Sequence, residues 1–231
     1  MKGFTIFLIL VIIVVAGYFV LRKPNDEMVT PTDETGDAMP SESSNETPNE
    51  NLSGTKTLDS EKSSAKWTGS KTLVKDYYDV GTIDIKSGTA IFAKGVLTGG
   101  SVVFDMNSIA TTSTGKGSDA DATSSQAKHM KSDDFFDAAK YPEAKFVITS
   151  AAKESGNAYL LNGDLTIKDK TNPVSFPAEV TESNGIATIE GSVTLDRTLW
   201  DIKYGSDKFF QDLGDKVIND DFTLEFTAVT K

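Results

Sequence analysis

The 231-residue chain contains no cysteine and only one histidine, His129. Without cysteine the chain has no disulfide, no thiol nucleophile and no thiolate metal site. A single imidazole excludes any site with two histidine ligands and argues against a histidine-based zinc site. The composition therefore offers few groups for metal or nucleophilic chemistry, and it indicates no cofactor.

Positive charge is also scarce. The chain has 23 Lys and Arg against 34 Asp and Glu, a formal net charge of −11. Over residues 65–231 the balance is 18 − 24 = −6, and no basic stripe with interleaved aromatic residues occurs there. An acidic surface repels phosphates, so we expect no nucleic-acid partner.

One long apolar run, "FTIFLILVIIVVAGYFVL", occupies residues 4–21. As a helix it would rise roughly 27 Å, enough to cross the hydrocarbon core of a bilayer. Arg22 and Lys23 follow without an Ala-x-Ala-like cleavage site. We therefore expect residues 1–23 to be an uncleaved single-pass anchor in the cell membrane, with the C-terminal domain extracytoplasmic. The alternative is a signal peptide whose cleavage leaves a secreted or periplasmic protein.

Residues 24–64 are rich in Asp, Glu, Ser, Thr, Asn and Pro and contain almost no large apolar residue. Ten acids stand against Lys56 and Lys62, a net charge of 2 − 10 = −8. Low hydrophobicity combined with high charge does not offset the entropy of ordering a chain. We expect an acidic, disordered linker over residues 24–64 and one folded domain over residues 65–231.

The folded domain has an apolar period of two. In "ATIEGSVTL" (187–195) and "DFTLEFTA" (221–228) apolar residues alternate with polar ones, and Gly, Asn, Asp and Ser separate such runs. This alternation is typical of an antiparallel sheet that covers a core with one face. About eight strands of this kind favour an all-β sandwich or a closed barrel.

Helical pattern is sparse. The best candidate covers residues 132–140, where Ser132 would cap a short helix with two aspartates in its first turn. The stretch "SDADATSS" (118–125) resembles the start of a calcium-binding loop. It lacks the Gly and Glu that an EF-hand loop needs at its sixth and twelfth positions, so we expect a flexible polar loop.

His129 is the one candidate for acid–base chemistry. A general base needs an orienting carboxylate and a substrate proton within reach. Asp133 lies four residues further on, but no serine in a nucleophile-elbow context occurs. We therefore expect no catalytic residue, and we interpret His129 as a structural residue or a contact of a ligand head group.

Aromatic residues gather in "HMKSDDFFDAAKYPEAKF" (129–146), which contains Phe135, Phe136 and Phe146. Ordinary core packing is one interpretation of these rings, and an aromatic-lined cavity for an apolar ligand is the other.

A second mixed cluster has Arg197 and Lys203 close to Trp200 and Tyr204. These cations either form surface ion pairs or hold the polar head of a ligand at a barrel mouth.

Six ordered stretches resemble the YceI-like family of lipid- or polyisoprenoid-binding proteins over about residues 62–230. They are "AKWTGSK" (65–71), "LTGGSVVFDMNSI" (97–109), "HMKSDDFFDAAKYPEAKF" (129–146), "NGDLTIKDKTNPVSFP" (162–177), "LDRTLWDIKYG" (195–205) and "DKVINDDFTLEF" (215–226).

The resemblance implies an extended, antiparallel, lipocalin-like barrel around an elongated apolar cavity. Such a barrel would bind, transport or sequester a long-chain amphiphile such as an isoprenoid quinone, a polyprenyl phosphate or a fatty amide, without catalysis. Its partners would be this lipid and the membrane reached through the N-terminal helix, while homodimerisation is left open. The candidate cavity or head-group residues are Trp67, Phe104, His129, Phe135, Phe136, Phe146, Phe176, Arg197, Trp200 and Tyr204.

Two residues depart from the family pattern. Asp79 stands where the family often has the histidine of a His-x-Gly, although Gly81 is retained, and Asp201 stands where it often has glycine. An aspartate near the cavity mouth would disfavour a pyrophosphate head through like-charge repulsion.

Two other functions stay open. A filled barrel would be an interaction module without a cavity. A lipid-modifying enzyme would use His129, Asp133 and Arg197.

Overall fold

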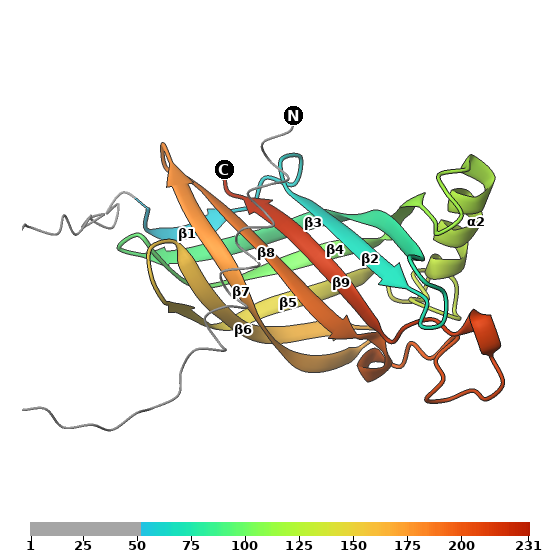
Figure 1. Ribbon diagram of the computed structural model, residues 1–231. Helices are drawn as coiled ribbons and strands as arrows, with labels where there is room; N and C mark the ends of the chain where they lie inside the picture. The colour runs from blue at the N-terminus through green and yellow to red at the C-terminus, as the bar shows by residue number, and fades with distance from the viewer. Residues whose placement is uncertain (1–51) are drawn as a thin grey trace, which may run out of the picture. The chain divides into compact units, whose positions relative to one another are not determined.

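A computed structural model of the protein describes residues 52–231 (Figure 1). Within these residues nine strands form one antiparallel sheet. The strands are β1 Gly54–Thr57, β2 Ser64–Ser70, β3 Tyr78–Ala93, β4 Val96–Ser113, β5 Glu143–Lys153, β6 Ala158–Ile167, β7 Lys170–Ser183, β8 Ile186–Asp196 and β9 Asp221–Val229. The helical elements are α2 Ala120–Lys131 and the short 3₁₀ turns η1 Arg197–Trp200 and η2 Gly214–Lys216.

Strand β3 closes the sheet into a barrel, because it pairs with β2 on one side and with β4 on the other. The hydrogen-bonded ring therefore runs from β2 through β9 and back to β2. Strand β2 pairs with residues 78–83 of β3, and β1 pairs with residues 89–92 of the same strand. The two short strands therefore follow one another along β3. The predicted all-β antiparallel barrel of about eight strands is confirmed by this closed ring.

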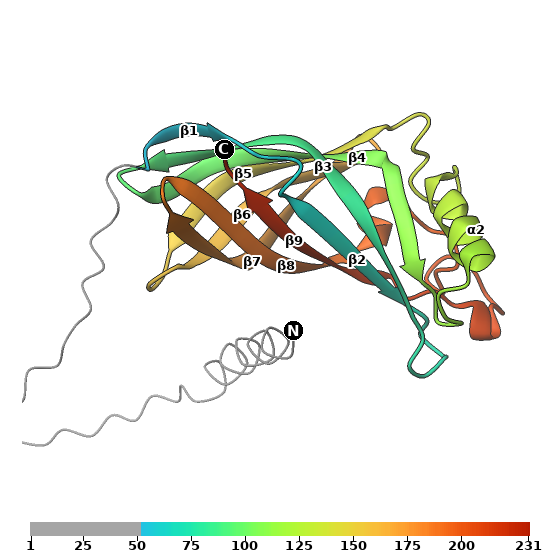
Figure 2. The same cartoon turned by 90° about the horizontal axis from the view of Figure 1, so that it is seen from above.

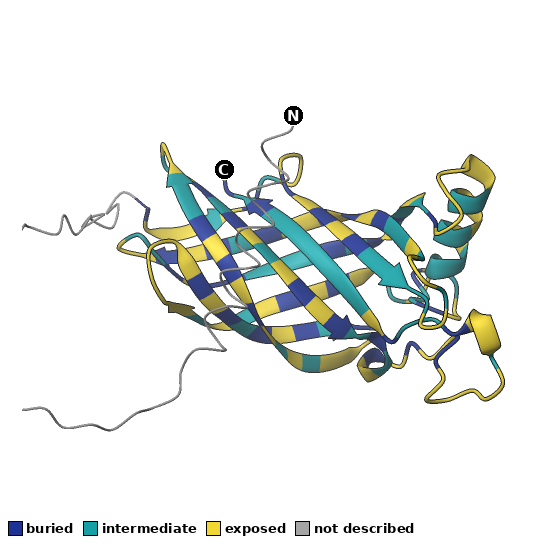
Figure 3. Cartoon of the chain, in the orientation of Figure 1, coloured by how far each residue is buried: buried dark blue, intermediate teal, exposed yellow. Residues whose placement is uncertain are grey.

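As predicted, the apolar residues of the alternating stretches face the core. In β8 the side chains of Ala187, Ile189, Val193 and Leu195 are buried inside the barrel, and buried and exposed residues alternate along the strands (Figure 3). Two-residue turns join neighbouring strands, as at Asn184–Gly185, where both residues have positive φ angles of 55° and 80°. This conformation matches the right-handed twist of the flanking strands.

The predicted disordered linker is wrong for residues 52–64. These residues contain β1, and their two leucines, Leu52 and Leu58, are only 1% and 3% exposed. The segment is ordered because β3 supplies backbone hydrogen-bond partners and the barrel end receives both leucines. Local composition does not reveal such tertiary contacts.

The predicted anchor (1–23) and the rest of the linker (24–51) lie outside the described residues. Within residues 52–231 no helix is long and apolar enough to cross a membrane.

The short helix exists, but its predicted position is wrong. Helix α2 begins after Asp119, whose carboxylate accepts hydrogen bonds from the backbone N–H groups of Asp121 and Ala122. Ser132, which we expected to begin a helix, instead ends α2 by donating its backbone N–H to the carbonyl of His129. The stretch 118–125, which we expected to be a flexible loop, therefore leads into and forms the first turns of α2.

The two ends of the barrel differ. The β3–β4 hairpin and β1 lie at one end, and α2 with the β8–β9 connection lies at the other (Figures 1 and 2). At the hairpin end Leu97 is fully buried, and its backbone N–H lies 3.4 Å from the hydroxyl of the buried Tyr159. The α2 end holds the candidate site.

Candidate ligand-binding site

A cavity of about 500 Å³ lies in the α2 half of the barrel. Its inner wall is mainly apolar, and its residues come from β2, β3, β4, β5, β6, β8 and β9. Polar groups enter the lining from the ends of β2 and β3, from α2 and from the β8–β9 connection. An apolar chamber with a few polar groups on one side is the usual form of a site for a small amphiphilic molecule.

Nine of the ten residues expected from the sequence line a cavity. Seven line the large one: Trp67, Phe104, His129, Phe135, Phe136, Arg197 and Tyr204. Phe146 and Phe176 line a second cavity of about 50 Å³, deeper in the barrel.

Trp200 is the exception, and its predicted place in the cavity lining is wrong. Its buried indole N–H donates a 3.0 Å hydrogen bond to the carbonyl of Leu165, and its side chain lines neither cavity. Trp200 lies in the 3₁₀ turn η1, beyond the end of β8. The residue is part of the core.

Trp67 forms part of the cavity wall because its strand neighbour is a glycine. Trp67 on β2 lies opposite Gly81 on β3. A Cβ atom at position 81 would collide with the indole ring and with the carbonyl of Ala110. The absence of a side chain at Gly81 therefore lets the Trp67 ring lie against the barrel wall.

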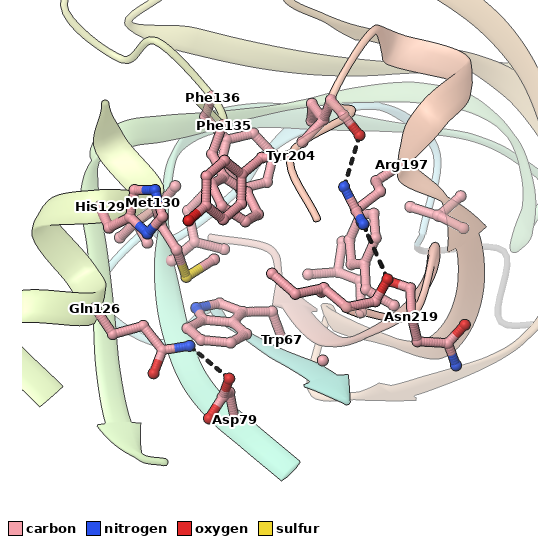
Figure 4. Close-up of a pocket in the computed structure, with 18 of the residues that line it drawn as sticks. Trp67, Asp79, Gln126, His129, Met130, Phe135, Phe136, Arg197, Tyr204 and Asn219 are labelled. Atoms are coloured by element: carbon pink, nitrogen blue, oxygen red, sulfur yellow. Dashed lines mark hydrogen bonds between the residues drawn. The ribbon is translucent and has the colours of Figure 1, made fainter. Parts of the chain in front are cut away.

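Three rings meet where α2 covers the barrel (Figure 4). The centroid of the His129 ring lies 5.1 Å from that of Phe135 and 4.6 Å from that of Tyr204. The His129 Nε2 atom lies 3.1 Å from a carboxylate oxygen of Asp134. The sequence analysis considered Asp133, four residues after His129, as an orienting carboxylate, whereas the structure places Asp134 beside the ring.

Arg197 is buried and holds the β8–β9 connection together. Its Nε, Nη1 and Nη2 atoms donate hydrogen bonds to the carbonyls of Asn219, Ile202 and Ile218, at 3.1, 2.8 and 3.1 Å. Its Nη2 atom also lies 3.2 Å from Asp220, an ion pair without hydrogen-bond geometry. Burial lowers the pKa of Arg197, while Asp220 opposes this shift. Each guanidinium nitrogen thus has a backbone partner, which indicates a structural role.

Lys203 and Asp201 form the surface ion pair that was one of the two expectations for this region, with Nζ and Oδ1 2.5 Å apart. Asp201 has a left-handed backbone, with φ of 63°. Glycine adopts this conformation most easily and aspartate is among the residues that tolerate it, so Asp201 is compatible with the turn.

Asp79 is engaged at the cavity mouth. Its carboxylate accepts hydrogen bonds from the Gln126 side chain at 2.6 Å and from the Gly115 backbone at 3.1 Å. Burial raises the pKa of the adjacent Tyr77 hydroxyl, and the charge of Asp79 raises it further. Asp79 thus connects β3 to α2 and adds negative charge beside the chamber.

The sequence interpretation missed several lining residues, among them Gln126 and Met130 on α2 and Asn219 before β9. Gln126, His129 and Met130 have the i, i+3, i+4 spacing of one helical face, which would have identified them had the helix been placed correctly. No sequence pattern indicates Asn219. Within residues 52–231 no three carboxylate or imidazole groups lie close enough to hold a metal ion.

Two solved structures have the same fold. *Burkholderia cenocepacia* BcnA is 22% identical, with a TM-score of 0.58 over 75% of this chain and 99% of that chain. A domain from *Saccharophagus degradans*, described as polyisoprenoid binding and implicated in plant cell wall breakdown, is 16% identical, with a TM-score of 0.56 over 76% of this chain and 97% of that chain. At these identities the likeness shows the fold alone.

Curated relatives match a shorter stretch. A UPF0312 protein of *Photorhabdus laumondii* is 49% identical over 53 residues, and Protein YceI of *Escherichia coli* O157:H7 is 43% identical over 53 residues. Each match covers 23% of this chain and 27% of the relative. The model of the YceI-like domain, in contrast, matches residues 57–230, which is most of the chain. The chain therefore belongs to the YceI-like family.

Proposed function

We propose that this protein binds the apolar chain of a lipid inside its barrel, at a membrane surface, and carries or sequesters that lipid without chemical change. The observation that supports this most directly is the chamber of about 500 Å³, with Trp67, Phe104 and Phe222 among its apolar walls. The same cavity counts against the alternative of a filled barrel.

Burial of the chain supplies enough free energy for useful affinity. Each buried methylene contributes about 0.8 kcal/mol, so roughly ten would contribute about 8 kcal/mol before the cost of ordering the ligand. A net free energy of about 8 kcal/mol corresponds to a micromolar dissociation constant, so ten methylenes alone give weaker binding, and further buried groups of the ligand offset the cost of ordering it. No covalent step and no charged clamp is required.

Isoprenoid quinones, polyprenyl phosphates and fatty amides are the ligand classes that we consider. The description of the *Saccharophagus degradans* domain supports an isoprenoid. Asp79 shares the cavity lining with the cations Lys71 and Lys216, so the charge at the mouth does not by itself choose between a neutral and an anionic head.

A membrane location is supported by the surface around the mouth. Leu73, Phe209 and Phe210 are 66%, 48% and 48% exposed, and they lie in the β2–β3 and β8–β9 connections at the α2 end. Apolar side chains on such loops can enter the interfacial region of a bilayer. A lipid could then pass from the bilayer into the cavity with little exposure to water.

For the α2 end to face the bilayer, the residues between the proposed anchor and the barrel must reach along the length of the barrel. Leu52 lies at the opposite, hairpin end, where its carbonyl accepts the N–H of Gly95. Between residue 23 and Leu52 lie 51 − 23 = 28 residues, which extend to at most about 95 Å. The longest strand, β4, has 18 residues and is about 60 Å long. An anchor at residues 4–21 would therefore let the α2 end face the bilayer.

Native mass spectrometry of the full chain, isolated gently from its own membranes, tests the proposal. We expect a discrete added mass that extracts into organic solvent. The variant Ala144→Phe would fill the cavity and remove this mass, whereas Ala152→Phe, on the exposed part of the same strand, would keep it. An unloaded wild type that also fails to take up any offered lipid would contradict the function.

The enzymatic alternative has a separate test. His129→Ala removes the only imidazole of the chain. We expect the bound lipid to be chemically unchanged by the wild type and by this variant. Conversion of the lipid by the wild type, and its loss in the variant, would favour an enzyme.

A further inference from the structure

The interior of the barrel is divided into two chambers. The large one has about 500 Å³ and the deep one only about 50 Å³. Phe104 on β4, Leu165 on β6 and Leu224 on β9 line both chambers. These three side chains lie at the boundary between the two spaces, and we call them the partition.

Behind the partition three phenylalanine rings fill the barrel. The ring centroids of Phe146 and Phe176 are 5.4 Å apart, and those of Phe176 and Phe226 are 5.6 Å apart. The rings come from β5, β7 and β9, so they line up across alternate strands. Tilted and edge-to-face contacts at these distances are favourable ring geometries.

The wall is shaped to receive the last of these rings. Gly191 on β8 is the direct strand neighbour of Phe226 on β9. A Cβ atom at position 191 would lie only 2.8 Å from the Phe226 ring. The missing side chain therefore provides the space in which the Phe226 ring lies. The row of rings is thus packed against the wall and does not merely project into an empty channel.

The hairpin end, beyond the rings, is packed with core residues. At the hairpin end Phe92 is 2% exposed and Leu97 is fully buried. Leu58, which follows β1, also lines the deep chamber. A chain that entered at α2 would therefore stop inside the barrel.

We infer that the partition and the three rings limit the ligand to a short, single-chain amphiphile. This inference rests on the proposed function and names its ligand class. A cavity of about 500 Å³ falls within the size range of sites that bury a drug-sized ligand. That suits a fatty amide or a short prenyl compound, whereas a long polyprenyl chain would have to leave most of its length outside.

The test is a competition between two uncharged alcohols of the same chemistry and different length. The full chain is mixed with equal amounts of farnesol, which is short, and solanesol, which is long, and native mass spectrometry quantifies each complex. We expect the wild type to bind farnesol at least tenfold more than solanesol. Equal binding, or a preference for solanesol, would overturn the inference.

Strand β9 supplies the test of the partition. Leu224 lines both chambers and Phe226 only the deep one, and both face inward from this strand. The double variant Leu224→Ala/Phe226→Ala should join the chambers and reduce the preference for farnesol at least fivefold. Leu160→Ala removes an exposed side chain of β6 that lines neither chamber, so it should keep the preference.

Each further outcome has a defined meaning. Circular dichroism checks that the variants are folded, and Leu224→Ala alone replaces the double variant if the latter does not fold. If a folded variant that opens the partition keeps the wild-type preference, the partition and the rings do not set the length limit and the inference is wrong. If the wild type binds neither alcohol and carries no native lipid, the proposed function itself fails.

Discussion

The hairpin half and the α2 half of this barrel are built from the same strands and the same apolar–polar alternation, yet they differ in packing. In the hairpin half Phe92, Leu97 and Leu161 are almost fully buried. In the α2 half the inward residues Phe222 and Leu224 are only partly buried, because they face the cavity. Alternation therefore determines which side chains point inward, and it does not determine whether they fill the interior.

The covers of the two ends differ as well. The hairpin end is closed by core residues, among them Leu52 and Leu58. Helix α2, at the other end, has no buried residue. Segments with few buried apolar contacts open at the lowest free energy. We therefore interpret the hairpin half as the source of stability and the α2 half as the part that opens for a ligand.

The largest expected effect is the difference in the free energy of unfolding between two Phe→Ala variants, one in each half of the barrel. Phe92→Ala creates a void in a packed core and should lower the free energy of unfolding by about 3 to 5 kcal/mol. Phe222→Ala removes a ring that already borders a cavity, so it should cost about 1 kcal/mol. Urea denaturation of both variants measures the difference, and equal losses would show that the two halves do not differ in packing.

Arg197 is the exception within the α2 half, because it is a tightly held group next to the cavity. Arg197→Ala would leave the carbonyls of Ile202, Ile218 and Asn219 without their donor and would leave Asp220 with Lys208 as its remaining ion-pair partner. We expect a loss of about 3 kcal/mol in the free energy of unfolding. Hydrogen exchange should rise mainly in residues 201–220.

Lys203→Ala, which breaks only an exposed ion pair with Asp201, is the control for this experiment. Its exchange pattern should resemble that of the wild type. If Arg197→Ala were as stable as this control, the hydrogen bonds of Arg197 to the backbone would have no structural role, and its predicted contact with a ligand head would regain weight.

The strands of the barrel could largely be predicted from local sequence pattern, whereas α2 and the β8–β9 connection could not. The strand regions and nine cavity residues could be predicted because side-chain direction follows from a period of two. Trp200 could not be placed, because it follows β8 in a 3₁₀ turn where that period no longer applies.

Helix α2 was missed because its Ser- and Asp-rich beginning is also typical of loops. The capping Asp119 and the lysines of the last turn, Lys128 and Lys131, are helix signals that can be recognised in the sequence. The partners of Arg197 lie five to 22 residues further along the chain, so only the folded backbone identifies them.

The two tryptophans report separately on the cavity and on the core. Trp67 lines the cavity, and its indole N–H has no hydrogen-bond partner among residues 52–231, so Trp67→Phe should be well tolerated. Trp200→Phe loses the hydrogen bond to Leu165 and should cost about 1 kcal/mol. Addition of farnesol should change the fluorescence of Trp200→Phe and leave that of Trp67→Phe almost unchanged. The reverse result would place the ligand outside the large cavity.

The smallest expected effect is on the acid sensitivity of the β8–β9 connection, which lies with α2 at the α2 end of the barrel. Asp196 accepts hydrogen bonds from Thr198 and from Lys208, which also pairs with Asp220. Burial alone would raise the pKa of Asp196, but these hydrogen bonds and the charge of Lys208 hold it below its ordinary value of 3.8. The stabilisation is therefore complete above pH 3.8 and is lost as the pH falls through the lower, folded-state value.

Asp196→Asn and Lys208→Met should each reduce the acid dependence of hydrogen exchange in residues 201–220, because each removes one side of the same contact. Exchange at the hairpin end should respond much less to either substitution, since neither residue contacts that half. If the variants kept the full acid dependence of the wild type, another carboxylate would control the opening of the cover. If they changed exchange equally at both ends, the two halves would open as one unit and the distinction between a stable half and an opening half would fail.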